Sequence, residues 1–169
     1  MSMKGQKWPG QRWLHQFRGA LTGPLIVILT LMACPSYADE LLMVRSLEAF
    51  PEAMSTLQTS IREHGYAITR VQRIDIGLTG MGYKTDKYRV VFVGKPDEIH
   101  YLVDRYPSLA PYMPPQISVF AEGDDTLMVT ANPQIYADMV EDEEDKLIFQ
   151  RWENDVYSVF KDIRQASRE

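Results

Sequence analysis

The stretch Tyr88-Arg89-Val90-Val91-Phe92-Val93 decides the fold, because it is the strongest strand signal in the chain. Almost all of it is apolar and half of it is valine, which is typical of a strand buried on both faces of a sheet. Pro96-Asp97-Glu98 then opens a helix that carries Ile99, Leu102 and Val103 on its inner side. This helix must end before Pro107, because the residue ahead of a proline is pushed out of helical geometry.

Toward the N-terminus, the pattern predicts a strand, a helix and a second strand. Residues 41–44 indicate a short strand, and apolar residues then recur at helical spacing behind Pro51: Phe50, Met54, Leu57 and Ile61. His64-Gly65 ends this helix, with a glycine that can adopt the left-handed cap conformation. Residues 66–71 predict a strand that continues loosely to Ile76 with a bulge or break near Gln72, and residues 77–82 predict a flexible glycine-rich connection.

Toward the C-terminus, residues 117–121 and 127–131 predict two strands joined by the turn Glu122-Gly123-Asp124-Asp125. Asn132-Pro133 caps a third helical segment. A last helix over about 146–165 carries one apolar stripe, made of Phe149, Trp152, Val156, Val159 or Phe160, and Ile163. The order β-α-β-β-α-β-β-α with an extra C-terminal helix predicts an α+β fold in which helices back an antiparallel sheet.

The first 38 residues have the three parts of a secretory signal. They contain Lys4, Lys7, Arg12 and Arg18 without any acidic residue, an apolar run over 21–33, and the small-residue exit Ser36-Tyr37-Ala38. The run is too short to span a bilayer, which takes about 20 residues. We therefore expect cleavage between Ala38 and Asp39, a single domain over 39–169, and a periplasmic or secreted location. Alternatively, residues 31–34 resemble a lipobox, in which Cys34 is lipidated and anchors the protein to the envelope.

The charge of the mature part excludes some partners. Residues 39–169 hold all 23 acidic residues and 14 of the 18 basic ones, so their net charge is −9. This argues against binding to nucleic acid and to anionic membrane surfaces, which both need clustered Lys and Arg. Cys34 is the only cysteine, so the mature domain must be stabilised by core burial without an internal disulfide.

Several local patterns over residues 46–140 resemble the bacterial and archaeal family of domain of unknown function 302. The patterns are His64-Gly65-Tyr66, residues 88–94 with Pro96 behind them, residues 111–119, and residues 129–133. The resemblance implies a curved antiparallel sheet backed by helices, much like one half of the TATA-binding-protein fold, and makes homodimers unsurprising. It implies no catalytic residues. Where many relatives carry cysteines this chain has Lys95 and Pro115, so a thiol role is absent, and the C-terminal helix is expected to lie beyond the family domain.

No catalytic constellation emerges from the titratable residues. His64 lies at a helix end, where the helix dipole favours a cation. His100 has Asp104 one turn later and Glu98 nearby, which is the spacing of a base and its orienting carboxylate. Exposed pairs of this kind are common and weak, so we assign no catalytic residue.

The sequence also predicts no metal site and no cofactor. A zinc site needs three or four convergent ligands, and the mature chain has two separated histidines and no cysteine. The acidic run over residues 141–145 lacks the alternating ligands of a calcium loop and is expected to be a solvated face or loop. The glycine-rich segment 77–82 with Lys84 behind it matches neither phosphate-binding signature.

Tyrosines and prolines remain as the candidate functional feature. They are interleaved over residues 83–115: Tyr83, Tyr88, Tyr101, Tyr106, Tyr112, Pro107, Pro111, Pro114 and Pro115. Tyrosine suits both a ligand pocket and a protein interface, although ordinary core packing uses it too. We therefore expect a non-enzymatic module that binds a small molecule or an envelope protein. An enzyme that uses carboxylate chemistry and a structural component of an envelope complex remain the alternatives.

Overall fold

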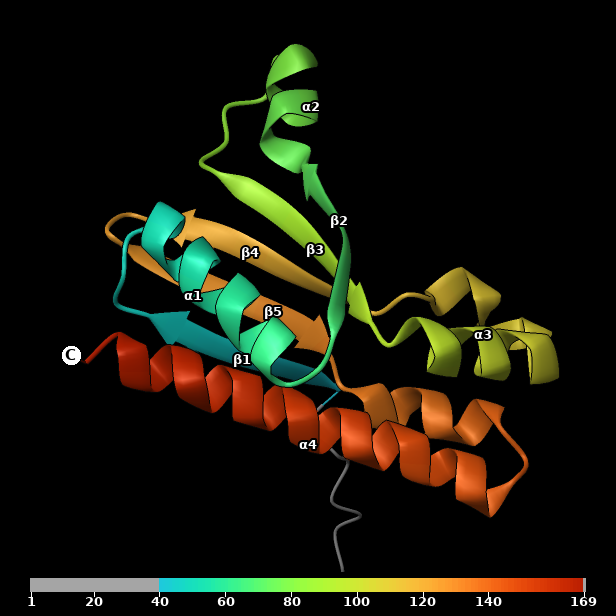
Figure 1. Cartoon of the computed structure of the whole chain (residues 1–169). Helices are drawn as coiled ribbons and strands as arrows, with labels where there is room; N and C mark the ends of the chain where they lie inside the picture. The colour runs from blue at the N-terminus through green and yellow to red at the C-terminus, as the bar shows by residue number, and fades with distance from the viewer. Residues whose placement is uncertain (1–39, 169) are drawn as a thin grey trace, which may run out of the picture. The chain divides into compact units, whose positions relative to one another are not determined.

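The structure is a computed structural model that describes residues 40–168, so Ala38, Asp39 and the alternative Cys34 lie outside the described residues. It shows a five-stranded antiparallel sheet with helices packed against it, which confirms the predicted α+β class (Figure 1). The elements follow the chain as β1 (Leu41–Ser46), α1 (Phe50–Glu63), β2 (Ala67–Arg73), α2 (Ile74–Gly80), β3 (Tyr88–Gly94), α3 (Pro96–Arg105), η1 (Pro107–Tyr112), β4 (Gln116–Glu122), β5 (Asp125–Ala131), η2 (Pro133–Met139) and α4 (Glu143–Ala166).

The strands pair in the order β1-β5-β4-β3-β2, with every neighbouring pair antiparallel. The N- and C-terminal halves of the chain thus both reach the sheet, because β1 pairs with β5. The predicted turn at Gly123-Asp124 joins β4 and β5 as a hairpin. Gly65 ends α1 with φ +77°, the left-handed conformation that the sequence predicts there.

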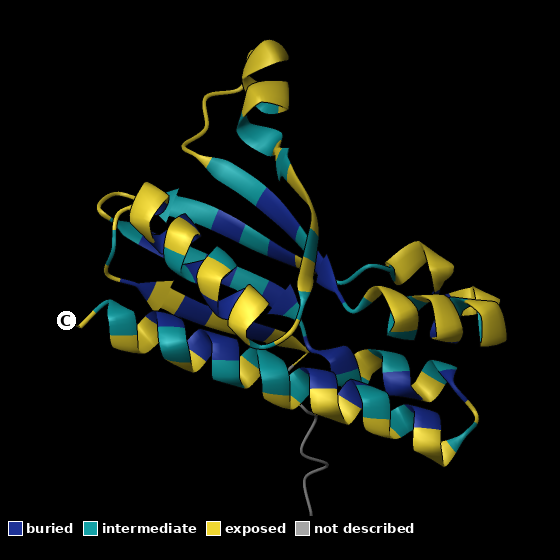
Figure 2. Cartoon of the chain, in the orientation of Figure 1, coloured by how far each residue is buried: buried dark blue, intermediate teal, exposed yellow. Residues whose placement is uncertain are grey.

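One face of the sheet is covered by α1 and α4, and the main core lies between them. The strands contribute every second residue to this core: Leu42, Val44, Val91, Val93, Ile117, Val119 and Met128. Helix α1 adds Leu57 and Ile61, and α4 adds Phe160 and Ile163, all almost fully buried. Figure 2 shows the resulting stripes, with buried residues on the inner sides of both helices and exposed ones outside.

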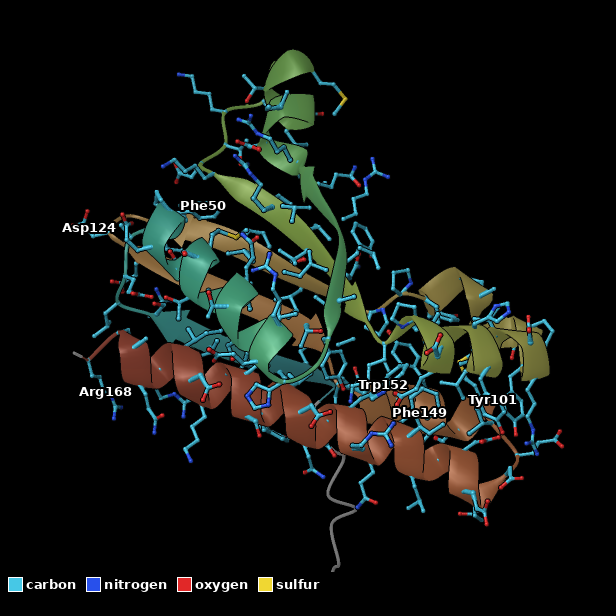
Figure 3. The ribbon with its side chains drawn as sticks, viewed as in Figure 1. Phe50, Tyr101, Asp124, Phe149, Trp152 and Arg168 are labelled. Atoms are coloured by element: carbon cyan, nitrogen blue, oxygen red, sulfur yellow. The ribbon has the colours of Figure 1, made fainter. Side chains whose placement is uncertain are left out.

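A second core lies beyond the end of the sheet, where α3, η1 and η2 meet the first half of α4. It consists of Leu102, Leu109, Ala137, Val140, Phe149 and Trp152. Figure 3 shows Phe149 and Trp152 of α4 beyond this end of the sheet, close to α3. Helix α4 thus spans both cores, and its apolar stripe packs within the chain.

The segment that was expected to be a flexible connection contains a helix, and this is a correction. Gly77 in its interior and Gly80 at its last position favour a loop, since a glycine inside a helix costs about 1 kcal/mol. Capping bonds offset that cost in α2: Tyr83 N donates to Leu78 O at 3.1 Å, and Gly82 has φ +87°. Asp75 in the first turn is ion-paired with Arg89 of β3, which ties the helix to the sheet.

Two smaller predictions also need correction. The β2 bulge lies between Ile68 and Arg70 rather than near Gln72, and β2 ends at Arg73 because α2 begins at the next residue. The acidic run leads into α4, and Glu141, Glu143 and Glu144 are exposed as expected, so only the burial of Asp145 departs from the predicted solvated face or loop. Asp142 caps that helix by accepting from Glu144 N at 2.9 Å, and Asp145 is only 4% exposed. Carboxylates in a first turn are favoured by the helix dipole.

Candidate functional site

The side of the sheet opposite α1 and α4 carries the candidate site. Strand residues that alternate with the core positions point to this side, which we call the open face: Leu41, Met43, Tyr88, Val90, Phe92, Gln116, Ser118, Phe120, Leu127, Val129 and Ala131. All except Val90 are half-buried or exposed. Leu41 and Met43 are 53% and 58% exposed, which is unusual for large apolar side chains in a sheet.

A hollow of about 330 Å³ lies at one end of the open face. Its floor comes from the strands, and its wall comes from the proline-rich segment before β4 together with η2. The lining residues are Leu41, Phe92, Pro111, Tyr112, Met113, Pro114, Pro115, Gln116, Ser118, Val129, Thr130, Ala131, Pro133 and Tyr136. None of them carries a charge, so the hollow is apolar and aromatic with a few neutral polar groups.

The proline-rich wall follows from the chemistry of proline. Pro114 and Pro115 have no N–H to give to a sheet ladder, so the segment cannot pair as a strand until Gln116 begins β4. The carbonyl of Pro115 accepts a hydrogen bond from Val93 N at 2.9 Å, which fixes the segment to the end of β3. Prolines also limit backbone freedom, so this wall is largely formed before any ligand arrives.

Two tyrosines stand at the mouth of the hollow. The ring centroids of Tyr112 and Tyr136 are 5.5 Å apart. The Tyr136 ring also contacts that of Phe149, which in turn contacts Trp152 in the second core. Burial, with a smaller contribution from Tyr112, raises the pKa of Tyr136. The Tyr136 hydroxyl therefore stays protonated at neutral pH and is able both to donate and to accept a hydrogen bond.

A polar network holds α4 next to this end of the sheet. Tyr66 Oη donates to Asp155 Oδ2 at 2.7 Å, and Lys95 Nζ lies 3.5 Å from the same oxygen and 4.5 Å from the centroid of the Tyr66 ring. Burial and the bond to Asp155 raise the pKa of Tyr66. Glu98 accepts from Trp152 Nε1 at 2.7 Å. These contacts connect the link between α1 and β2, the start of α3, and α4, and they lie outside the hollow.

The comparisons with known proteins give the family. The sequence profile described as domain of unknown function DUF302 matches residues 42–163. The chain belongs to the DUF302 family. Among solved structures, it is similar to an uncharacterised conserved DUF302 protein from Bacillus stearothermophilus, with 17% identity and a TM-score of 0.67 over 75% of this chain and 100% of that one. This likeness shows the fold. No curated protein sequence matches the chain.

The DUF302 match corrects the extent that the sequence analysis gave to the family domain. The match runs to residue 163, beyond the expected end at 140, and so includes most of α4. The structure gives the reason, because Phe149, Trp152, Phe160 and Ile163 of that helix complete both cores. A DUF302 domain without α4 would leave both cores open to water.

Lys95 and Pro115, the two positions where the resemblance leads one to expect cysteines, lie in different parts of the structure. Pro115 lines the hollow, and Lys95 pairs with Asp155 in the network above. The remaining tyrosines of the predicted cluster disperse: Tyr88 stacks on Phe120 at the other end of the open face, Tyr101 and Tyr106 bond to Asp145, and Tyr83 is 63% exposed beside α2.

The histidines and the acidic run do not converge on the hollow. His64 Nε2 lies 2.9 Å from Asp162 Oδ2 of α4, and His100 Nε2 lies 3.4 Å from Asp104 Oδ2 with both side chains mostly in solvent. Within residues 40–168, no three His, Cys, Asp or Glu side chains are grouped so that they could hold a metal ion. In the same part of the chain, no helix combines the length and apolar character needed to cross a membrane.

Proposed function

We propose that this DUF302 protein is an exported, non-enzymatic binding module that holds a small, neutral and mostly apolar molecule in the hollow. One observation carries the proposal. A preformed hollow of about 330 Å³, lined by aromatic, proline and aliphatic side chains, lies on a sheet face that the packed helices leave uncovered. Its volume is at the lower end of the range typical of small-molecule sites, roughly 300–1,000 Å³.

The lining indicates the chemical class of the ligand. An uncharged wall favours an uncharged ligand, because a charge buried there would lack a partner. The rings of Tyr112 and Tyr136 suit a flat aromatic or alicyclic body. Gln116, Ser118 and the Tyr136 hydroxyl provide neutral donors and acceptors for one or two polar groups on the ligand.

The enzyme alternative has less support from the geometry. The charged residues closest to a catalytic pattern, His100 and Asp104, have side chains 82% and 68% exposed and do not line the hollow. A general base must reach the bound substrate, and none of the residues that line the hollow is a carboxylate or a histidine. A ligand held there would meet hydroxyl, amide and apolar groups.

Nile red, an uncharged apolar dye, tests this proposal on the purified exported protein. Val129→Trp places a large ring in the hollow, while Leu127→Trp makes the same kind of change on the same strand and face, outside it. We expect saturable Nile red fluorescence with the native protein, a loss of at least about ten-fold in affinity for Val129→Trp, and little change for Leu127→Trp.

Equal affinities for the two tryptophan variants would contradict the proposal, as would no saturable binding by the native protein. Circular dichroism and thermal melting of both variants must first show native folding. Because both substitutions lie on the open face, away from the main core, we expect both to fold.

A further inference from the structure

The tip formed by residues 73–87 is the second prominent surface of the molecule. It comprises α2 and the link from α2 to β3, and it projects beyond the sheet (Figure 1). No residue of α2 is buried, and Figure 2 shows its outer turn as exposed. Three large apolar side chains of the tip lie open to solvent: Ile76 at 52%, Met81 at 68% and Tyr83 at 63% exposed.

The tip is also where the positive charge gathers. Residues 73–87 themselves contain three basic and two acidic residues, and Arg70 and Arg89 at their flanks bring the net charge of residues 70–89 to +3. The rest of 39–169 contains nine basic and 21 acidic residues, a net charge of −12. Asp75 is ion-paired with Arg89 and largely buried, so of the two acidic residues only the exposed Asp86 offsets an outer cation. Arg73, Lys84 and Lys87 are all exposed. The net charge of −9 over residues 39–169, which argues against an anionic membrane surface for the domain as a whole, conceals this separation.

We propose that this tip is a contact site for an anionic lipid surface, with Ile76, Met81 and Tyr83 entering the headgroup layer and Arg73 and Lys84 binding lipid phosphates. Exposed apolar side chains beside cations are the usual features of interfacial membrane contacts. Tyrosine prefers this layer, and long basic side chains reach phosphates while their stems stay in apolar surroundings. A tip that projects beyond the sheet suits contact with a deformable headgroup layer.

The tip is far enough from the acidic body to reduce the repulsion between that body and an anionic membrane. The seven residues of α2 rise about 10 Å, which exceeds the Debye length of about 8 Å at physiological ionic strength. A membrane touched by the tip would therefore be attracted by the +3 of residues 70–89 more strongly than it is repelled by the −12 of the more distant body. The ion pair between Asp75 and Arg89 keeps the tip attached to β3 during the contact.

Vesicle co-sedimentation tests this inference on exported protein that carries Cys34→Ser, so that no lipid can be attached. The probes are vesicles of phosphatidylglycerol and phosphatidylcholine in equal parts, and vesicles of phosphatidylcholine alone. We expect binding to the first, weak binding to the second, and a steep loss of binding as salt is raised.

Two sets of substitutions, each with a matched control, locate the contact. Arg73→Gln with Lys84→Gln should lower the partition coefficient about 25-fold, at roughly five-fold for each cation near the surface. Arg62→Gln with Arg168→Gln removes the same charge elsewhere and should have a much smaller effect. The second set replaces the apolar residues of the tip, and we expect at least ten-fold weaker binding from the triple variant Ile76→Gln, Met81→Gln and Tyr83→Gln. Its control replaces apolar residues of similar exposure elsewhere, in the triple variant Leu47→Gln, Leu147→Gln and Tyr157→Gln. This control should not weaken binding to that extent.

Three results would overturn the inference: no binding to phosphatidylglycerol vesicles, equal losses in tip and control variants, or self-association that depends on the tip. The last outcome, seen as a change of mass in sedimentation velocity, would mean that the tip meets the acidic body of a second copy instead. The inference is independent of the hollow. Val129→Trp should leave vesicle binding unchanged, and the tip variants should leave Nile red binding unchanged.

Discussion

Asp145 is one of the residues that hold α3 and the segment after it against α4. Its carboxylate accepts hydrogen bonds from Tyr101 Oη at 3.0 Å and Tyr106 Oη at 2.8 Å, and Arg105 Nε lies 3.4 Å away. The side chain is 4% exposed, so these groups rather than water satisfy it. A buried carboxylate of this kind is costly to disturb, because removing one partner leaves the others unsatisfied.

We predict that Asp145→Ala lowers the free energy of unfolding by about 2–4 kcal/mol, since two hydroxyls and a guanidinium lose their acceptor. Urea denaturation measures this directly. Glu144→Ala, on the exposed neighbouring residue, is the control and should change stability by less than about 0.5 kcal/mol. Similar values for the two variants would show that the network contributes nothing to stability.

Asp162 links α1 to α4 and makes this contact sensitive to acid. Its Oδ2 accepts from Ser60 Oγ at 2.7 Å and lies 2.9 Å from His64 Nε2. The bond from Ser60, then that from His64, lowers the pKa of Asp162 below its ordinary value of 3.8. A carboxylate whose pKa is lower in the folded state stabilises the fold above the unfolded-state value, and this stabilisation disappears as the pH falls through the folded value.

Asp162→Asn should therefore cost stability at neutral pH and cost progressively less below pH 3.8. The loss at neutral pH should be at most about 1 kcal/mol, because the carboxylate is partly exposed and screened by solvent. Melting temperatures of the native protein and the variant, measured from pH 7 to pH 2, provide the check. A difference that stays constant over this range would contradict the assignment.

At the scale of elements, α4 joins the two cores. Trp152 is 2% exposed, packs edge-on against Phe149 with ring centroids 5.5 Å apart, and donates to Glu98 of α3. Further along the helix, Phe160 and Ile163 complete the core under the sheet. The helix is thus an integral part of both cores, in agreement with a family match that extends to residue 163.

Trp152→Ala should destabilise the protein by about 3–5 kcal/mol, the usual cost of truncating a buried tryptophan. Because Trp152 docks within its own chain, the melting temperature of the variant should not depend on protein concentration. Leu147→Ala, which removes a 60% exposed side chain from the same helix, should be nearly neutral. A shift from dimer to monomer in the Trp152→Ala protein would instead place the contact between subunits.

The strands and long helices could be predicted because their signals are local. Valines in residues 88–94 and the stripe on α4 each determine their own element. Helix α2 was missed because Gly77 and Gly80 disfavour a helix, and the bonds that offset them come from its cap and from Arg89. Burial of Asp145 was missed because its partners lie about 40 residues earlier in the sequence.

The hollow could be predicted only in part, for the same reason. Tyr112 and its neighbouring prolines belong to the predicted cluster, whereas Phe92, Val129 and Tyr136 come from other elements. These side chains come together through the register of β3, β4 and β5, and no local sequence pattern predicts that register. A usable signal was present in β5, where Leu127, Val129 and Ala131 alternate with the core positions and leave an apolar second face.

At the scale of the whole molecule, we propose an exported domain that carries an apolar hollow and a separate cationic tip. Export is the condition for both proposals, since it places the domain beside envelope lipids. We predict cleavage between Ala38 and Asp39, because Ser36 and Ala38 give the peptidase the small residues it needs. Intact mass of the exported protein checks this, and a mature chain that begins at a diacylated Cys34 would replace the free form with an anchored one.

Native mass spectrometry of protein purified from its own periplasm tests the central claim most directly. The native protein should carry an additional small-molecule mass that disappears on collisional activation, and Val129→Trp should lack it while Leu127→Trp retains it. Equal occupancy in both variants would contradict binding in the hollow, as would a native protein that carries no small molecule or carries only a protein partner.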